Sequence, residues 1–197
     1  MSEIISSPRP CAAPGLFTVT DLLIHPYMAA YPLSCEGASL KKITIDTNLL
    51  PADDFIEIAK VRGYEVGIGS VTERELGSSN SPLNVPELGR VLELGIVGES
   101  RVGSCVVGSG SDYLEIILQT ISNRSFPKSG NRGRLTDGQR RQLRDAMILE
   151  AHAREGRDIF VTNDKKGFID DGRREKLQSL LKTRILTREE FLRELRG

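Results

Sequence analysis

The stretch Ile159-Phe160-Val161-Thr162-Asn163-Asp164 places a short run of large apolar residues before a polar ending that carries an acid. A second stretch, Lys42-Ile43-Thr44-Ile45-Asp46, repeats this order with a β-branched run followed by an aspartate. Such runs are typical of strands buried in a parallel sheet, with the acid at the carboxyl end of each strand. Because the carboxyl ends of parallel strands share one edge of the sheet, we expect these two aspartates to lie near each other.

The segment after Asp46 predicts a helix followed by a second strand. Pro51 suits the first turn of that helix, and Gly63 suits the position just past its end. The apolar face of the helix would consist of Phe55, Ile56, Ile58, Ala59 and Val61. Residues 64–70 then predict a strand, and Thr72 with Glu75 forms the T-x-x-E capping box that opens another helix.

Capping patterns and apolar periodicity predict further helices in the second half of the chain. Ser111 precedes an amphipathic helix that continues to about residue 121, and Thr136 with Gln139 opens a helix that ends at Gly156. Strands are expected near 102–107 and at 183–186, with helices over 173–182 and after Thr187. Strands that alternate with helices indicate an α/β fold, in which helices flank a mostly parallel central sheet in three layers.

Composition divides the chain into regions of different regularity. Residues 1–40 are rich in Pro, Ser and Ala and predict an irregular N-terminal extension with one helical stretch around 20–28. Residues 41–197 would form the α/β domain, interrupted by a longer Gly-rich and then basic segment at about 77–134. A length of 197 residues suits one well-buried domain.

Charge, cysteine content and hydropathy exclude several classes of protein. Lys+Arg and Asp+Glu both number 27, so a nucleic-acid partner would need a local basic patch rather than a net charge. Cys11, Cys35 and Cys105 lack the spacing of a disulfide framework or a zinc site and are expected to be thiols in a reducing cytosol. No apolar run reaches the ~18 residues of a membrane span, and the N-terminus lacks the order of a secretory signal. We therefore expect a cytoplasmic protein with no membrane partner.

Four acids stand where a metal site could form. Asp46 and Asp164 end strands, Glu75 lies in the first turn of a helix, and Asp145 lies in the helix that leads to the strand at 159–161. Carboxylates gathered beside apolar strand ends repel one another unless a cation lies among them. Mg²⁺ or Mn²⁺ fits best, because both prefer carboxylates, waters and phosphate oxygens as ligands. With only two histidines and no paired cysteines, a zinc site is disfavoured.

Each acid also has a purely structural interpretation when it is taken alone. Asp46 could cap the turn before Pro51, and Glu75 could serve only its capping box. Asp164 could be a turn former. Asp145 could pair with a neighbouring base, the choices being Arg141, Arg144 and Lys166. The joint pattern of all four favours the metal site.

Several stretches together resemble the motifs of the PIN-domain nucleases. They are residues 43–48 (ITIDTN), 70–77 (SVTERELG), 144–153 (RDAMILEAHA) and 159–168 (IFVTNDKKGF), with an ending at 184–192 (RILTREEFL). Their order and spacing cover roughly residues 41–195, and the stretch at 159–168 is the most specific. Both Glu73 and Glu75 align with the acid of the second motif. Glu75 is preferred because of the threonine three residues before it and the leucine after it.

The resemblance implies a Rossmann-like PIN fold with an acidic Mg²⁺/Mn²⁺ pocket that hydrolyses phosphodiesters, usually in RNA. We expect an endoribonuclease whose substrate is single-stranded RNA. By position, the acidic set would be Asp46, Glu75, Asp145 and Asp164, with Thr162 as a supporting hydroxyl. A homodimer is expected by resemblance alone, and no protein partner is indicated. The extension at 1–40 and the long segment between the second and third motifs depart from the compact toxins of the family, so a toxin role is not expected.

Residues 123–144 predict the grip on RNA, because arginines pair with phosphates and glycines let the backbone approach them. Phe126 could stack on an unpaired base, and a solvated basic loop is the alternative for the whole segment. The predicted RNA-binding residues are Arg124, Lys128, Arg132, Arg134, Arg140 and Arg141, with Arg144 following in the same segment.

Three other functions compete with the nuclease. A PIN-like module could bind RNA or a protein without cutting. A phosphatase with an aspartyl-phosphate intermediate is disfavoured, because no second aspartate lies two positions after Asp46. A nucleotide-binding enzyme is disfavoured because no G-x-x-x-x-G-K-[ST] sequence occurs.

Overall fold

The computed structural model describes residues 40–72, 88–96, 100, 105–107 and 111–197, apart from the side chain of Asp54. Residue contacts divide the chain into Met1–Ala38 and Ser39–Gly197, and all described residues belong to the second unit. The expectations for residues 1–39, for Glu73 and Glu75, and for most of 77–110 lie outside the described residues.

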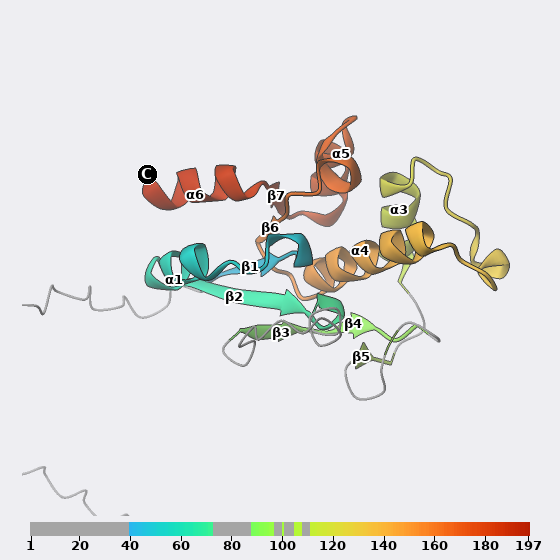
Figure 1. Cartoon of the computed structure of the whole chain (residues 1–197), viewed down its shortest axis with the longest axis horizontal. Coiled ribbons are helices and arrows are strands. Elements are labelled where there is room, and N and C mark those ends of the chain that lie inside the picture. The colour runs from blue at the N-terminus through green and yellow to red at the C-terminus, as the bar shows by residue number, and fades with distance from the viewer. Residues whose placement is uncertain (1–39, 73–87, 97–99, 101–104, 108–110) are drawn as a thin grey trace, which may run out of the picture. The chain divides into compact units, whose positions relative to one another are not determined.

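A parallel sheet forms the centre of the described unit (Figure 1). Its five strands lie in the order β3-β2-β1-β6-β7, and every neighbouring pair is parallel. A separate short parallel pair is formed by β4 and β5. The predicted α/β class with a mostly parallel central sheet is confirmed. The strands are β1 (Lys41–Ile45), β2 (Tyr64–Gly69), β3 (Gly89–Val91), β4 (Glu93–Leu94), β5 (Cys105–Val106), β6 (Ile159–Val161) and β7 (Arg184–Leu186).

The order in which the chain visits this sheet reverses at β1. From β1 the chain runs outward through β2 to β3, and it later returns to the other side of β1 as β6 and continues to β7. The register pairs Ile45 with both Ile68 and Val161, so β1 and β6 end beside each other. In sheets of this kind the connections diverge to opposite sides at the reversal, which leaves a crevice at the carboxyl ends of the two strands.

Helices cover both faces of the sheet and make three layers. On one face, α1 (Asp53–Val61) and α6 (Arg188–Arg196) contribute Phe55 and Phe191 to a core that also buries Ile43 and Val161. On the other face, helices bury a second core that contains Phe160 of β6. These helices are α3 (Asp112–Ile121), α4 (Asp137–Arg154) and α5 (Arg173–Leu181).

Most helix boundaries follow the predicted caps. The Oγ of Ser111 accepts the N–H of Leu114 at the start of α3, and the capping boxes that begin with Thr136 and Thr187 are both formed. These predictions are confirmed because local side-chain bonds satisfy the first N–H groups of each helix. The glycine expected to end α4, Gly156, has a positive φ of 61°.

Three predictions in the first half of the chain are wrong in detail. Pro51 lies before α1, whose N-cap is Ala52. Ile58 and Val61 are 41% and 85% exposed, because the buried arc of α1 is narrower than the full apolar set. Thr72 is already inside a helical segment that begins at Ser70, so Thr72 does not cap its start.

In the part of the chain that the structure describes, no helix has both the length and the apolar character needed to cross a bilayer.

Candidate functional site

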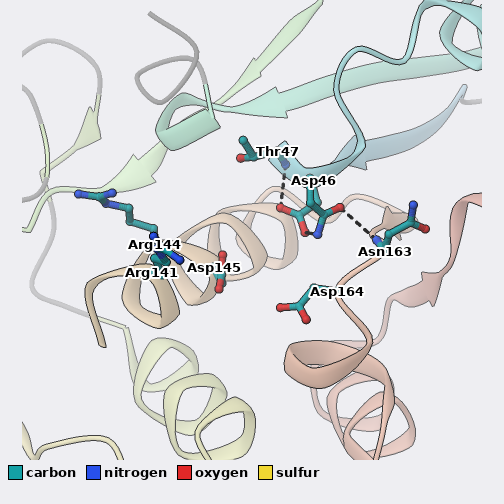
Figure 2. A pocket seen from close by; sticks show the side chains of 8 residues that line it. Asp46, Thr47, Arg141, Arg144, Asp145, Asn163 and Asp164 are labelled. Atoms are coloured by element: carbon teal, nitrogen blue, oxygen red, sulfur yellow. Dashed lines mark hydrogen bonds between the residues drawn. The ribbon is translucent and has the colours of Figure 1, made fainter. Parts of the chain in front are cut away.

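A cleft of about 560 Å³ opens where β1 and β6 end. Figure 2 shows the carboxylates of Asp46, Asp145 and Asp164 around this cleft, each from a different element. The structure thus brings together three of the four predicted acids, while Glu75 lies outside the described residues. The cleft is lined by Asp46, Thr47, Asn48, Arg141, Arg144, Asp145, Asn163 and Asp164.

Three hydrogen-bond donors among the described residues hold Asp46 in one orientation. The chain leaves β1 and turns at once into η1 (Thr47–Leu49), for which Asp46 is the N-cap. Its Oδ1 accepts the N–H of Thr47 at 2.7 Å, and its Oδ2 accepts the side-chain amide of Asn48 at 2.8 Å and the hydroxyl of Thr162 at 2.6 Å. The residue is only 3% exposed, and these donors offset the removal of its charge from water. The cap role considered for Asp46 is therefore real, and it also fixes the carboxylate at the cleft.

Thr162 joins the two strand ends that carry aspartates. Its fully buried hydroxyl donates to Asp46 and accepts the backbone N–H of Asp164 at 3.0 Å. The amide of Asn48 approaches the same oxygen at 3.2 Å. One hydroxyl thus couples the geometry of the acid after β1 to that of the acid after β6.

A tight turn positions Asp164, and this turn requires glycine at position 167. It is the N-cap of η4 (Lys165–Ile169), a single π-helical turn, and its Oδ1 accepts the N–H of Gly167 at 3.0 Å. A Cβ on Gly167 would overlap Oδ2 of Asp164 and lie 3.1 Å from its Cγ. Only a residue without a side chain lets this carboxylate keep its place beside the turn.

Two asparagines of the cleft were missed as site residues by sequence reasoning. The Oδ1 of Asn48 accepts the N–H of Asn163 at 3.1 Å, which adds a second link between the ends of β1 and β6. Asn163 in turn accepts the N–H of Arg188, at the start of α6, at 3.3 Å. The available signal was the amide two residues after Asp46, a spacing that lets it donate back to the acid.

The cleft combines acids with bases that α4 supplies. Arg141, Arg144 and Asp145 come from the same stretch of this helix and line the same cavity (Figure 2). Among the described residues, no three His, Cys, Asp or Glu side chains form a ready-made metal cage. The side-chain atoms of the cleft that could bind a cation are oxygens. A hard cation such as Mg²⁺ commonly takes one or two carboxylates as ligands and completes its shell with water and phosphate. The residues present fit such an ion in an open site.

Phe126 and Arg132, in the predicted RNA-binding segment, make contacts within the protein. Phe126 is 3% exposed and belongs to the core between α3 and α4, so the suggestion that it stacks on a base is wrong. The guanidinium of Arg132 lies over the Phe126 ring at 5.0 Å and pairs with Glu115 at 2.7 Å. The ring of Phe126 packs into the core and holds the loop there, and Arg132 lies over this ring.

The other predicted RNA-binding residues do not gather at one place. Arg141 lines the acidic cleft, whereas Arg124 lines a separate cavity. Lys128 and Arg134 are exposed, and Arg140 is half-buried. At least two of these positive side chains, Arg141 and Arg124, therefore line different cavities of the described structure.

His152 is a buried structural residue rather than a ligand or a catalytic base. Its Nδ1 lies 2.9 Å from the hydroxyl of Thr44 and its Nε2 lies 2.6 Å from that of Thr183. Burial, and then the charge of Arg157, lowers the pKa of His152 to about 3. The neutral imidazole thus ties α4 to β1 and to the residue that precedes β7.

Searches of protein-family models, of curated proteins and of solved structures found no match to this chain. The class defined by fold and cleft is an α/β domain that gathers three aspartates where the strand order of its sheet reverses.

Proposed function

We propose that this chain is a Mg²⁺- or Mn²⁺-dependent endoribonuclease of the PIN-like kind. The observation that carries the proposal is the meeting of Asp46, Asp145 and Asp164 at one cleft, from positions far apart in the chain. Their place at the strand reversal is where parallel α/β sheets bind ligands.

The proposed ion would be held by Asp46 and Asp164, with Asp145 as a further ligand or as the group that orients a water. When bound, it would lower the pKa of a water molecule and neutralise charge on the leaving oxygen. Glu75 belongs to the proposed set through the resemblance alone. We assign the nucleophile to the water that this ion would activate.

The residues around the acids have separate tasks in this proposal. Thr162 and Asn48 keep the carboxylate of Asp46 turned toward the cleft. Arg141 and Arg144 would pair with phosphate oxygens of the strand beside the scissile bond, because a guanidinium matches phosphate in a bidentate manner. Single-stranded RNA is the proposed substrate. The cytoplasmic location and the homodimer stay predictions.

A matched pair of substitutions tests the proposal. Asp164→Asn keeps an oxygen that can accept the N–H of Gly167 and so preserves the N-cap, but it removes the charge. Asp112→Asn is the control, because Asp112 is exposed in the first turn of α3 and lines neither the acidic cleft nor the cavity at Arg124. Wild type and the control should cut single-stranded RNA with Mn²⁺ and stop on chelation, whereas Asp164→Asn should be at least about 10²-fold slower. Equal activity in all three proteins would refute the proposal.

Asp46→Asn is a less selective test of the same site. Its carboxylate accepts three donors in a nearly closed environment, and an amide would turn one acceptor into a donor. The mismatch would cost about 1–3 kcal/mol of folding free energy. Loss of activity in that variant therefore needs a melting curve beside it.

The alternative function is an RNA-binding module that does not cut. It is favoured by Arg141 and Arg144 inside the cleft, because guanidinium groups bind phosphate without a metal. Mn²⁺ titration followed by the cleavage assay separates the two functions. Tight RNA binding with no Mn²⁺ response and no cleavage would favour the alternative.

A further inference from the structure

A small basic cavity lies between the end of α3 and the first turn of α5. Its volume is about 210 Å³, and it shares no lining residue with the acidic cleft. Arg124, Arg173 and Lys176 line it together with a single acid, Asp171. We infer that this cavity binds a phosphate group, and that the phosphate belongs to the RNA strand. The strand as the source rests on the proposed function, whereas the phosphate site itself does not.

The balance of charge distinguishes this cavity from its neighbour. A larger cavity between η4 and α6 is lined by three bases and three acids, so its charges cancel; they are Lys165, Arg174, Arg193, Asp170, Glu189 and Glu190. The cavity at α5 has three bases and one acid. The excess of positive charge favours anion binding in the cavity at α5 and not in the cavity between η4 and α6.

One base of the small cavity is held in place by contacts within the protein, and the other two are exposed and can contact a ligand. Arg173 pairs with Asp171 at 3.0 Å, donates to the carbonyl of Asp170 at 3.3 Å, and is 14% exposed. In the described part of the chain, neither Arg124 nor Lys176 forms an ion pair, and both are exposed. A phosphate would thus meet one pre-oriented guanidinium and two cations whose charge the described protein does not neutralise.

The backbone of Arg124 supports a role for its side chain. Its φ of 65° is left-handed, and its N–H bonds to the carbonyl of Gln119 at 2.7 Å to close the end of α3. Glycine fits such a position with less strain than arginine. The position therefore carries a charged side chain where local structure alone would favour none.

This left-handed backbone also provides a selective test. Arg124→Gly removes the charge and relieves strain, so loss of binding would not reflect unfolding. Lys182→Gly is the matched control, because Lys182 is also exposed and left-handed, with φ 55°, and lines none of the cavities described above. Lys176→Ala, in the exposed first turn of α5, is the second test variant.

Binding of a fluorescein-labelled single-stranded oligouridylate to the full chain is measured by anisotropy at several salt concentrations in EDTA. Without divalent ions the assay does not depend on cleavage, so failure of the nuclease proposal leaves it interpretable. Arg124→Gly and Lys176→Ala should each weaken binding roughly tenfold. Each should also lower the salt slope by up to about 0.7, the contribution of one phosphate on a single strand. Lys182→Gly should match the wild type.

Inorganic phosphate provides the second arm. In one outcome, phosphate raises the melting temperature of wild type but not of Arg124→Gly, and all variants bind RNA equally well. This outcome would assign the site to free phosphate and not to the RNA strand. Wild-type RNA affinity, salt slope and phosphate response in both test variants would overturn the inference.

Discussion

Replacing Gly167 by alanine should move one carboxylate of the acidic cleft and leave the fold intact. The added Cβ would overlap Oδ2 of Asp164, so the carboxylate must retreat by about 1 Å to restore ordinary contact. The backbone of Gly167 is not left-handed, and alanine can adopt it. A displacement of that size in a reacting group lowers a rate by roughly 10²-fold.

The expected change in stability is small because two effects oppose each other. Loss of the cap bond between Asp164 and the N–H of Gly167 costs about 1 kcal/mol. Replacing glycine by alanine returns about 0.4–1 kcal/mol by restricting the unfolded chain. The net change should move the melting temperature by no more than about 4 °C.

The assay compares Mn²⁺-dependent cleavage of single-stranded RNA with thermal melting for the same preparations. Gly138→Ala is the control, because a Cβ at Gly138 meets nothing within 4 Å. The control should retain full activity. Full activity in Gly167→Ala would refute the reasoning, since it would show that the position of Asp164 does not limit the reaction. A large loss of stability in that variant would also contradict it.

Three further predictions concern the same domain. Thr162→Val should lower the free energy of unfolding by about 1–3 kcal/mol and reduce cleavage, because Asp46 and the N–H of Asp164 lose their shared hydroxyl; Thr162→Ser should behave as wild type in melts and assays. Mn²⁺ at 100 times its Kd should stabilise wild type by about 2.7 kcal/mol in melting curves, and an equal shift in Asp164→Asn would contradict a role for this acid in metal binding. Burial lowers the pKa of His152 to about 3 from an ordinary 6.5, so the unfolded chain takes up the proton first as pH falls. The stabilisation from the neutral ring is complete above pH 6.5 and is lost toward pH 3, by roughly 3 kcal/mol at pH 4.5; denaturant melts of His152→Gln against pH should lack this component.

The parts of the fold that sequence predicted correctly are those that local chemistry decides. The capping boxes at Thr136 and Thr187 formed as expected, because their hydrogen bonds lie within one turn of helix. The apolar runs that became β1 and β6 were also recognisable, since both faces of these strands are buried. The acids after those strands could be placed at one edge of the sheet for the same reason.

The failures concern properties that depend on tertiary contacts. Phe126 lies in a Gly-, Ser- and Arg-rich loop, and nothing local to it shows that α3 and α4 would enclose its ring. The exposure of Val61 follows from which arc of α1 faces the sheet, and not from the composition of that helix. The cavity at Arg124 forms only when α5 lies beside α3, more than 40 residues apart in the sequence, so a run of arginines could not reveal it.

The hydrogen bonds of Asn48 and Thr162 join the segment after β1 to the segment after β6, which lie far apart in the sequence. This separation has a consequence during synthesis of the chain. These hydrogen bonds join segments 114 to 116 residues apart, and the proposed cation would join the same segments. A nascent chain therefore carries Asp46 long before Asp164 has left the ribosome. If the cleft cuts RNA as proposed, the nascent polypeptide cannot cleave its own messenger RNA until translation of the domain is nearly complete.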